Sequence, residues 1–102
     1  MDEIDEIICK AIKEMRRLKI NYKGEDWRII EPHCFGCDRK GNKKLRAYQV
    51  SGYSESGNSE GWKLFNVDEI RKIEPLNERF NEPRPKYNPY GDKHIPNVIC
   101  KI

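Results

Sequence analysis

The stretch that decides the fold is Leu45-Arg46-Ala47-Tyr48-Gln49-Val50, a short run with the apolar and aromatic content of a strand. A second run of this kind, Trp62-Lys63-Leu64-Phe65-Asn66-Val67, follows shortly after it. Residues 51–61 between the two runs are dense in Ser, Gly and Asn. Two strand-like runs joined by such a segment predict an antiparallel hairpin. We expect this hairpin to be the centre of a small β-barrel.

Alternation along the first of these runs separates its two faces, because successive side chains of a strand point to opposite sides. Leu45, Ala47 and Gln49 share one face, and Arg46 and Tyr48 lie on the other. Leu45 and Ala47 are the better candidates for a core. We therefore expect Arg46 and Tyr48 to face outward, where they can meet a ligand.

Apolar residues near the start of the chain recur at intervals of three and four, which predicts a helix over residues 2–18 with one apolar side. Carboxylates precede this stripe and cations follow it, an order that suits the helix dipole. We expect the stripe to pack across the barrel. Its members are Ile4, Ile7, Ile8, Ala11, Ile12, Met15 and Leu18.

The spacing then changes to that of strands. Residues 19–22 and 27–31 predict a first hairpin, and Pro32 is expected to end it because proline cannot donate to a strand ladder. Residues 33–38 would then cross the end of the barrel.

Shorter elements are predicted beyond the central hairpin. Asp68 is expected to cap a helical turn over residues 68–71, and Asn77 to cap another that brings Phe80 inward. Pro75 places any strand here near an edge of the sheet. Residues 97–102 are apolar enough for a last strand.

The composition fits one small domain. The chain has 102 residues, of which 36% are hydrophobic and 36% charged. No apolar stretch approaches the roughly 20 residues that span a bilayer, and the acidic start is unlike a signal peptide. We therefore expect a cytoplasmic protein without a membrane partner.

Residues 81–96 contain four prolines and therefore predict neither a long helix nor a central strand. Tyr87 and Tyr90 make this stretch richer in aromatic residues than a disordered linker, so we expect an arm that lies along the domain surface. The predicted organisation is a helix plus β-barrel over residues 1–80, with residues 81–102 packed on the same domain.

The four cysteines are expected to be reduced thiols in a cytoplasmic chain, so no disulfide framework is predicted. Cys34 and Cys37, preceded by His33, have the spacing of half a zinc site. His94 and Cys100 are candidates for the other two ligands, but their spacing matches no common zinc pattern. Isolated thiols are the preferred interpretation, and no metal or cofactor is predicted.

The net charge of +3 is mild, but its distribution is uneven. Residues 39–46 hold five cations and no acid, whereas residues 1–6 hold four carboxylates. A basic stripe beside Tyr48, Tyr53 and Trp62 suits a phosphate backbone whose bases stack on the rings. The alternative is a solvated turn in which lysines keep a strand edge soluble.

The order of these elements resembles the bacterial WYL domain. The matching stretches are residues 11–12 with 20–22, then 27–33, 45–49 and 62–70, and finally Phe80. Lys43-Lys44-Leu45 stands where the family has Trp-Tyr-Leu, and both arginines of its Arg-x-Phe-x-Leu-Asp-Arg-Ile motif are replaced, by Lys63 and Glu69. The tail from Pro83 onward looks like that of short, stand-alone members.

The resemblance implies an α+β fold in which an N-terminal helix packs on an SH3-like or Sm-like antiparallel barrel. It also implies a module that senses a ligand, often a nucleotide or oligonucleotide, in regulators whose attached winged helix-turn-helix binds DNA. This chain has no room for that second domain. We therefore expect a sensing module without its own output domain, in a transcription-regulatory or defence-regulatory context.

The first functional hypothesis is a binding module for a nucleotide or single-stranded nucleic acid. In it, guanidinium and ammonium groups hold phosphate, rings stack bases, and His33 and Gln49 read the edge of a base or sugar. The phosphate ligands are Arg28, Arg46 and Lys63, and the stacking residues are Tyr48 and Trp62. Alternatively, both rings are core residues, Arg28 pairs with Glu31 or Asp68, and His33 satisfies a loop carbonyl.

The second hypothesis is a protein-interaction or oligomerisation module, in which the Pro-rich arm or an exposed strand edge docks on a second copy or on a regulatory protein. An enzyme is not expected. The sequence contains no Gly-rich phosphate loop and no Gly-x-Ser-x-Gly or His-Glu-x-x-His motif. Nearness of His33 to Cys34 and Cys37 in the sequence does not establish a catalytic geometry.

Overall fold

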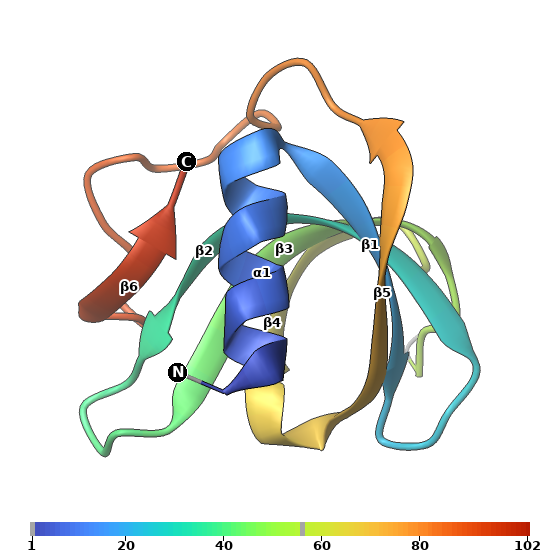
Figure 1. The fold of residues 1–102 in the computed structure, drawn as a ribbon, viewed down its shortest axis with the longest axis horizontal. Helices are drawn as coiled ribbons and strands as arrows, with labels where there is room; N and C mark the ends of the chain where they lie inside the picture. The colour runs from blue at the N-terminus through green and yellow to red at the C-terminus, as the bar shows by residue number, and fades with distance from the viewer. Residues whose placement is uncertain (1, 56) are drawn as a thin grey trace.

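The computed structural model describes residues 2–55 and 57–102, so Met1 and Ser56, the latter within the predicted loop 51–61, lie outside the described residues. One helix packs on a six-strand antiparallel sheet, which is an α+β fold as predicted (Figure 1). The elements, in chain order, are α1 (Glu3–Glu14), β1 (Arg16–Tyr22), β2 (Trp27–Cys37), β3 (Lys43–Gly52), β4 (Gly61–Asn66), the 3-10 turn η1 (Val67–Glu69), β5 (Ile70–Arg79) and β6 (Asn97–Lys101).

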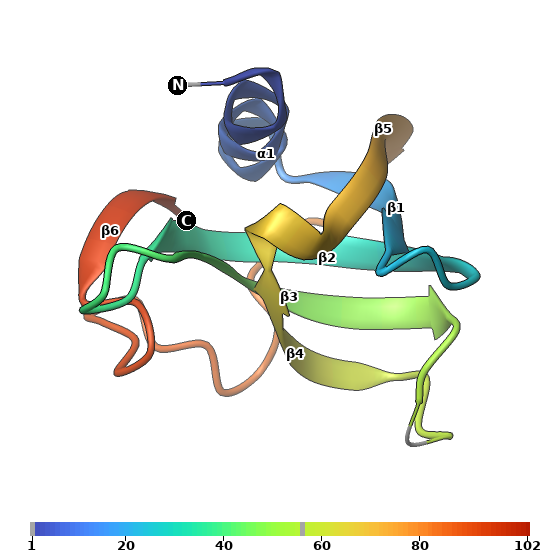
Figure 2. The same cartoon turned by 90° about the horizontal axis from the view of Figure 1, so that it is seen from below.

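The strands run in the order β4-β3-β2-β1-β5, and β6 pairs with the far end of β2. The end strands β4 and β5 are joined by η1 alone, whose three residues span at most about 11 Å. The sheet must therefore curl to bring its two ends together (Figure 2). Within residues 2–55 and 57–102, no ladder pairs β4 with β5.

The core lies between α1 and the concave face of the sheet. The central hairpin is confirmed, with Leu45 opposite Phe65 and Tyr48 opposite Trp62. Leu45, Ala47 and Gln49 are fully buried, which confirms the predicted inward face. The buried core residues are Ile8, Ala11 and Ile12 of α1 and Leu18, Ile20, Tyr22, Ile30, Phe35, Leu45, Ala47, Phe65, Val67 and Ile70 of the sheet and η1.

Helix α1 is shorter than predicted. The Asp2 side chain caps its start by accepting from the Asp5 amide at 2.9 Å. It ends at Met15, which has a left-handed backbone (φ 51°) and whose amide returns to the last turn. Leu18 continues the three- and four-residue spacing, but it lies in β1, where it and Ile20 alternate into the same core.

Strand β2 does not end at Pro32, so the predicted crossing by residues 33–38 is wrong. Pro32 lies opposite Ala47, and the register with β3 shifts between Pro32 and Cys34. Such an irregularity accommodates a residue that cannot donate to the ladder. The strand continues to Cys37, and its last residues pair with β6 as well.

The predicted helical turns after the central hairpin are wrong in detail. Asn66, not Asp68, takes the capping position of η1 and makes no side-chain cap. Residues 70–79 form the edge strand β5, which leaves no turn at Asn77 but confirms the edge position of Pro75. Phe80 is buried as predicted.

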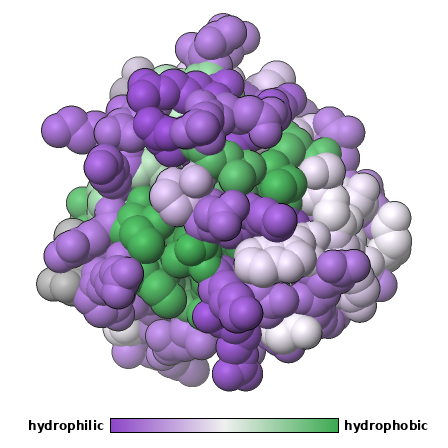
Figure 3. Space-filling view, turned by 45° about the vertical axis from the view of Figure 1, so that its right-hand side comes forward, coloured by the Kyte–Doolittle hydropathy of each residue, from purple (hydrophilic) through white to green (hydrophobic). Residues whose placement is uncertain are grey.

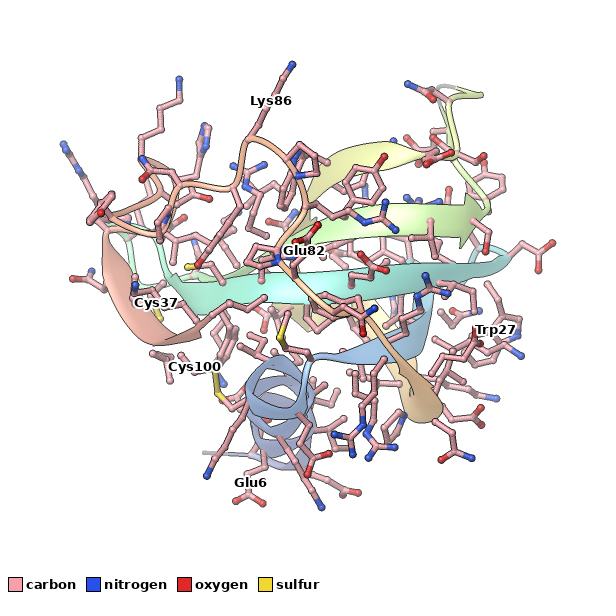
Figure 4. The ribbon with its side chains drawn as sticks, turned by 90° about the horizontal axis from the view of Figure 1, so that it is seen from above. Glu6, Trp27, Cys37, Glu82, Lys86 and Cys100 are labelled. Atoms are coloured by element: carbon pink, nitrogen blue, oxygen red, sulfur yellow. A yellow bond between two sulfur atoms is a disulfide. The ribbon has the colours of Figure 1, made fainter. Side chains whose placement is uncertain are left out.

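A disulfide joins Cys9 of α1 to Cys100 of β6, with their Cα atoms 5.8 Å apart (Figure 4). The prediction of four reduced thiols is therefore wrong. The two residues are 91 positions apart, and only the packing of the last strand beside the helix brings them together. In the described part of the chain, no helix is long and apolar enough to cross a membrane.

Candidate functional site

The side of β2 and β3 that faces away from α1 is covered by residues 81–96 (Figure 4). The indole Nε1 of Trp62 donates to the carbonyl of Pro85 at 3.0 Å, and the Tyr87 ring stacks beside the indole with centroids 6.3 Å apart. The guanidinium of Arg84 lies 4.4 Å from the centre of the Tyr48 ring. The outward residues of the central hairpin are thus partly covered by the chain's own segment.

This segment is anchored at the buried carboxylate of Glu31. Arg84 donates to it through Nε at 2.6 Å and Nη2 at 3.1 Å, and Arg17 donates through Nε at 3.0 Å. Burial alone would raise the pKa of Glu31, but the hydrogen bonds from the two guanidinium groups bring that pKa below its usual value. Glu31 is therefore a charged anchor under the segment.

A cleft of about 270 Å³ opens beside Trp62 and Tyr87, between β3 and residues 86–94. Arg46 lines it and donates to the Asp92 carboxylate, with Nε 2.8 Å from Oδ2. Burial tends to raise the pKa of Asp92, but hydrogen bonds from Arg46 and from the His94 amide lower it overall. Burial also raises the pKa of Tyr87 to about 12, so its hydroxyl keeps the proton that it donates to the carbonyl of Ile102.

A second cleft of about 510 Å³ adjoins the first, and Lys93 and His94 line both. We call the two together the basic groove; its cations are Arg39, Lys40, Lys44, Arg46, Lys86 and Lys93. Its carboxylates are Asp38, 4.0 Å from Lys44, and Asp92. With six cations and two carboxylates the lining carries a net charge of +4, which exceeds the +3 of the whole chain.

Of the predicted ligand residues, Arg46 and Trp62 line the basic groove, and Tyr48 lies beside it on the same face. Lys63 does not join them, because it follows Trp62 in β4 and points to the opposite face. Its Nζ contacts Ser54 and Asn58 at 3.4 and 3.0 Å.

Arg28 and Gln49 are also apart from the groove, on the concave side of the sheet. Gln49 is fully buried; it accepts from Arg28 at 3.3 Å and donates to the carbonyl of Tyr53 at 2.9 Å. The Arg28 side chain is 7% exposed and is also paired with Glu25. The structure therefore does not bring Arg28, Gln49 or Lys63 to the surface that carries Trp62.

His33 is fully buried and packs against residues 81–96, which we call the covering segment. Its Nδ1 is 2.8 Å from the Glu31 carbonyl, and its Nε2 accepts from the Arg84 amide at 3.1 Å. This pair of contacts defines a neutral ring protonated on Nδ1, and burial lowers the pKa of His33 accordingly. The ring lies against Phe80 at 5.3 Å and is not placed to read a base.

Cys34 and Cys37 are free thiols on β2. Cys34 is buried, and burial raises its pKa to about 11, which disfavours the thiolate that zinc requires. Residues three apart in a strand point to opposite faces. Among the residues described, no group of three or more His, Cys, Asp or Glu is arranged to hold a metal ion.

The groove residues that sequence reasoning missed are on the covering segment, above all Lys86, Tyr87 and Lys93. The feature of the sequence that could have pointed to these groove residues was the presence of tyrosines and lysines in a Pro-rich stretch. That stretch was expected on the surface, but its position over the central hairpin follows from contacts that no local pattern encodes.

Comparisons with family models, with curated proteins and with solved structures found no match to this chain. The fold and site define an α+β domain in which a helix packs on one side of a curled antiparallel sheet. On the other side, a Pro-rich segment and the central hairpin enclose a basic groove that contains two aromatic rings.

Proposed function

We propose that this chain is a non-catalytic binding module of the WYL type, whose curled sheet is an SH3-like barrel and whose basic groove binds a nucleotide or a single-stranded nucleic acid. The observation that carries the proposal is that Trp62 and Tyr87 line a cleft with three cations, and that this cleft adjoins a second cationic one. Single-strand binding sites combine these two features, a cationic track for the backbone and rings on which bases stack.

The charge of the groove supports a polyanionic ligand. Both of its carboxylates are already engaged, Asp92 by Arg46 and Asp38 by the loop amides of Lys40 and Asn42. Lys86 and Lys93 form no ion pair among the described residues and are free to contact phosphate. Each contact releases a condensed counterion, so the affinity must fall as salt rises.

The rings support recognition of bases. Trp62 and Tyr87 are both half-buried, so each is held in place and still exposes part of its surface to the first cleft. A base stacked on either ring adds about 1 to 3 kcal/mol with little preference for sequence. This favours a general single-strand ligand over one read by base edges.

The test is fluorescence anisotropy with labelled single-stranded DNA and RNA, and with a labelled mononucleotide, at low and moderate salt. Lys93→Gln is the diagnostic variant because Lys93 lines both clefts, and its loss is expected to reduce the salt-dependence slope by about 0.7. Lys10→Gln, on the α1 side of the sheet, is the matched control. Absence of binding even at low salt, or equal losses in both variants, refutes the proposal.

A second candidate is a protein-interaction or oligomerisation module. Figure 3 shows apolar side chains gathered on the face turned toward the viewer and broken up by polar ones. Ile7 of α1 and Ile73 of β5 are only partly buried at the edge of the core, and a cleft of about 420 Å³ lies between these elements. Light scattering tests this candidate: a concentration-independent monomer counts against it.

The resemblance to WYL regulators supports a transcription-regulatory or defence-regulatory context in the cytoplasm. The Cys9–Cys100 disulfide weighs against that compartment, because disulfides persist mainly in oxidising ones. A count of free thiols in protein taken from cells and alkylated at lysis distinguishes a reducing from an oxidising compartment. A fully reduced, cytoplasmic protein has four free thiols, and a protein with the disulfide has two.

A further inference from the structure

A further cleft, of about 310 Å³, has only Leu64 in common with the lining of the basic groove. It is formed where the start of β2 meets β4 and the loop after β3. Three cations line it, Lys23, Arg28 and Lys63, together with the carboxylate of Glu55. We call it the Arg28 cleft.

Arg28 is a buried cation with incomplete pairing. Its guanidinium lies among three rings, those of Tyr22, Tyr53 and Phe65, at 5.2, 5.6 and 5.5 Å from their centres. A guanidinium has five donors. One Nη donates to Gln49 and the other to Glu25, each at 3.3 Å, whereas the buried Nε has no hydrogen-bond partner. Buried polar groups are normally satisfied, so this orphaned donor shows that the pairing of Arg28 within the protein is incomplete.

The other two cations contact neutral groups, whereas Arg28 is paired with Glu25. Lys63 contacts neutral oxygens of Ser54 and Asn58, and the Lys23 ammonium lies 5.5 Å from the centre of the Tyr22 ring. Among the described residues, neither forms an ion pair. Even when Glu25, which pairs with Arg28, is counted with Glu55, the three cations outnumber the two carboxylates.

We propose that the Arg28 cleft binds a small oxyanion, of the class of inorganic phosphate, sulfate or the terminal phosphate of a metabolite. A guanidinium and two ammonium groups are the donors that suit the oxygens of such an anion. The rings around Arg28 shield the guanidinium from water, which strengthens its attraction for an anion. Since none of the three cations of this cleft lines the basic groove, the proposal does not depend on nucleic-acid binding.

The test is a titration of the full-length chain with inorganic phosphate, followed by ¹H–¹⁵N NMR at constant ionic strength. Saturable shifts are expected at the amides around Lys23, Arg28 and Lys63. Lys63→Gln removes one partly exposed cation that is not a member of the core and is expected to weaken the apparent affinity about tenfold, as for one charge-assisted hydrogen bond. Lys10→Gln, on α1 and away from both sites, is the matched control and is expected to leave the affinity at the Arg28 cleft unchanged.

Two results overturn the proposal: no saturable shift around Arg28 at tens of millimolar phosphate, or a response that Lys63→Gln and Lys10→Gln reduce equally. Spectral dispersion of the variants confirms that each is folded. Lys23→Gln provides an independent repeat, because it changes a different wall of the same cleft. Binding of oligonucleotides to the same samples reports on the basic groove separately, so failure at one place is distinguishable from failure at the other.

Discussion

Reduction of the Cys9–Cys100 disulfide is expected to remove a large part of the stability of this domain. The bond closes a loop of 91 residues, and the chain-entropy model gives about 4 to 5 kcal/mol for a loop of that length. Small domains unfold with about 5 to 15 kcal/mol in total. The midpoint of urea unfolding should therefore fall steeply when the bond is opened, because the unfolded chain regains its freedom.

The assay is urea unfolding followed by tryptophan fluorescence and far-ultraviolet circular dichroism, with and without dithiothreitol. Cys9→Ser is expected to reproduce the reduced protein and to become insensitive to the reductant. Cys37→Ser is the control, because Cys37 is a free, partly exposed thiol and its loss leaves the response to reductant intact. An unchanged midpoint after reduction would show that the bond does not form or does not constrain the unfolded chain.

Three further perturbations follow from the packing. The pKa values of His33 and Glu31 in the folded state lie below the unfolded values of 6.5 and 4.5, so on acidification the unfolded chain binds more protons than the folded one. The midpoint of urea unfolding should therefore fall from pH 7.5 to pH 5 and again to pH 3.5. Equal midpoints would refute the assignment. Leu18→Ala is expected to cost about 2 to 5 kcal/mol because Leu18 is fully buried in β1; a change below 1 kcal/mol in urea unfolding would show that it lies outside the core. Gly36→Ala would place a Cβ 2.2 Å from the Asn97 carbonyl, so hydrogen exchange should report faster opening of β6, and unchanged protection there would contradict the β2–β6 pairing.

The parts of the fold that local patterns encode were predictable from the sequence. Alternation placed Leu45 and Ala47 in the core, and Pro75 marked an edge strand. The end of α1 was missed because Leu18 satisfies the helical spacing and the strand spacing at once. The path of β2 was missed because a bulge, which the sequence does not mark, accommodates Pro32.

The residues of the candidate site likewise fall into those that local patterns predict and those that they do not. Arg46, Tyr48 and Trp62 share a face because cross-strand partners in a hairpin point to the same side, and this is readable from the sequence. The same alternation already excludes Lys63, the neighbour of Trp62, from that face. The burial of Arg28 and His33 was not readable, because it depends on contacts with Gln49 and Arg84, which are distant in the chain.

The polar and aromatic side chains on the outer face of this sheet are covered by residues 81–96, and this covering segment explains why they are there. Glu31 and His33 would be exposed to water if residues 81–96 were absent, and instead Arg84 satisfies both, the first through its guanidinium and the second through its amide. The four prolines suit this role, because they lower the entropy lost on ordering an irregular segment and reduce the number of backbone donors that need partners. The same segment contributes Tyr87 and Lys93 to the basic groove, so the structure that buries the Glu31 anchor also builds one wall of the proposed binding site. Arg84→Gln should therefore loosen both the anchor at Glu31 and this wall of the groove. It leaves Arg17 as the partner of the Glu31 carboxylate. It should also weaken oligonucleotide binding, even though Arg84 does not line the groove.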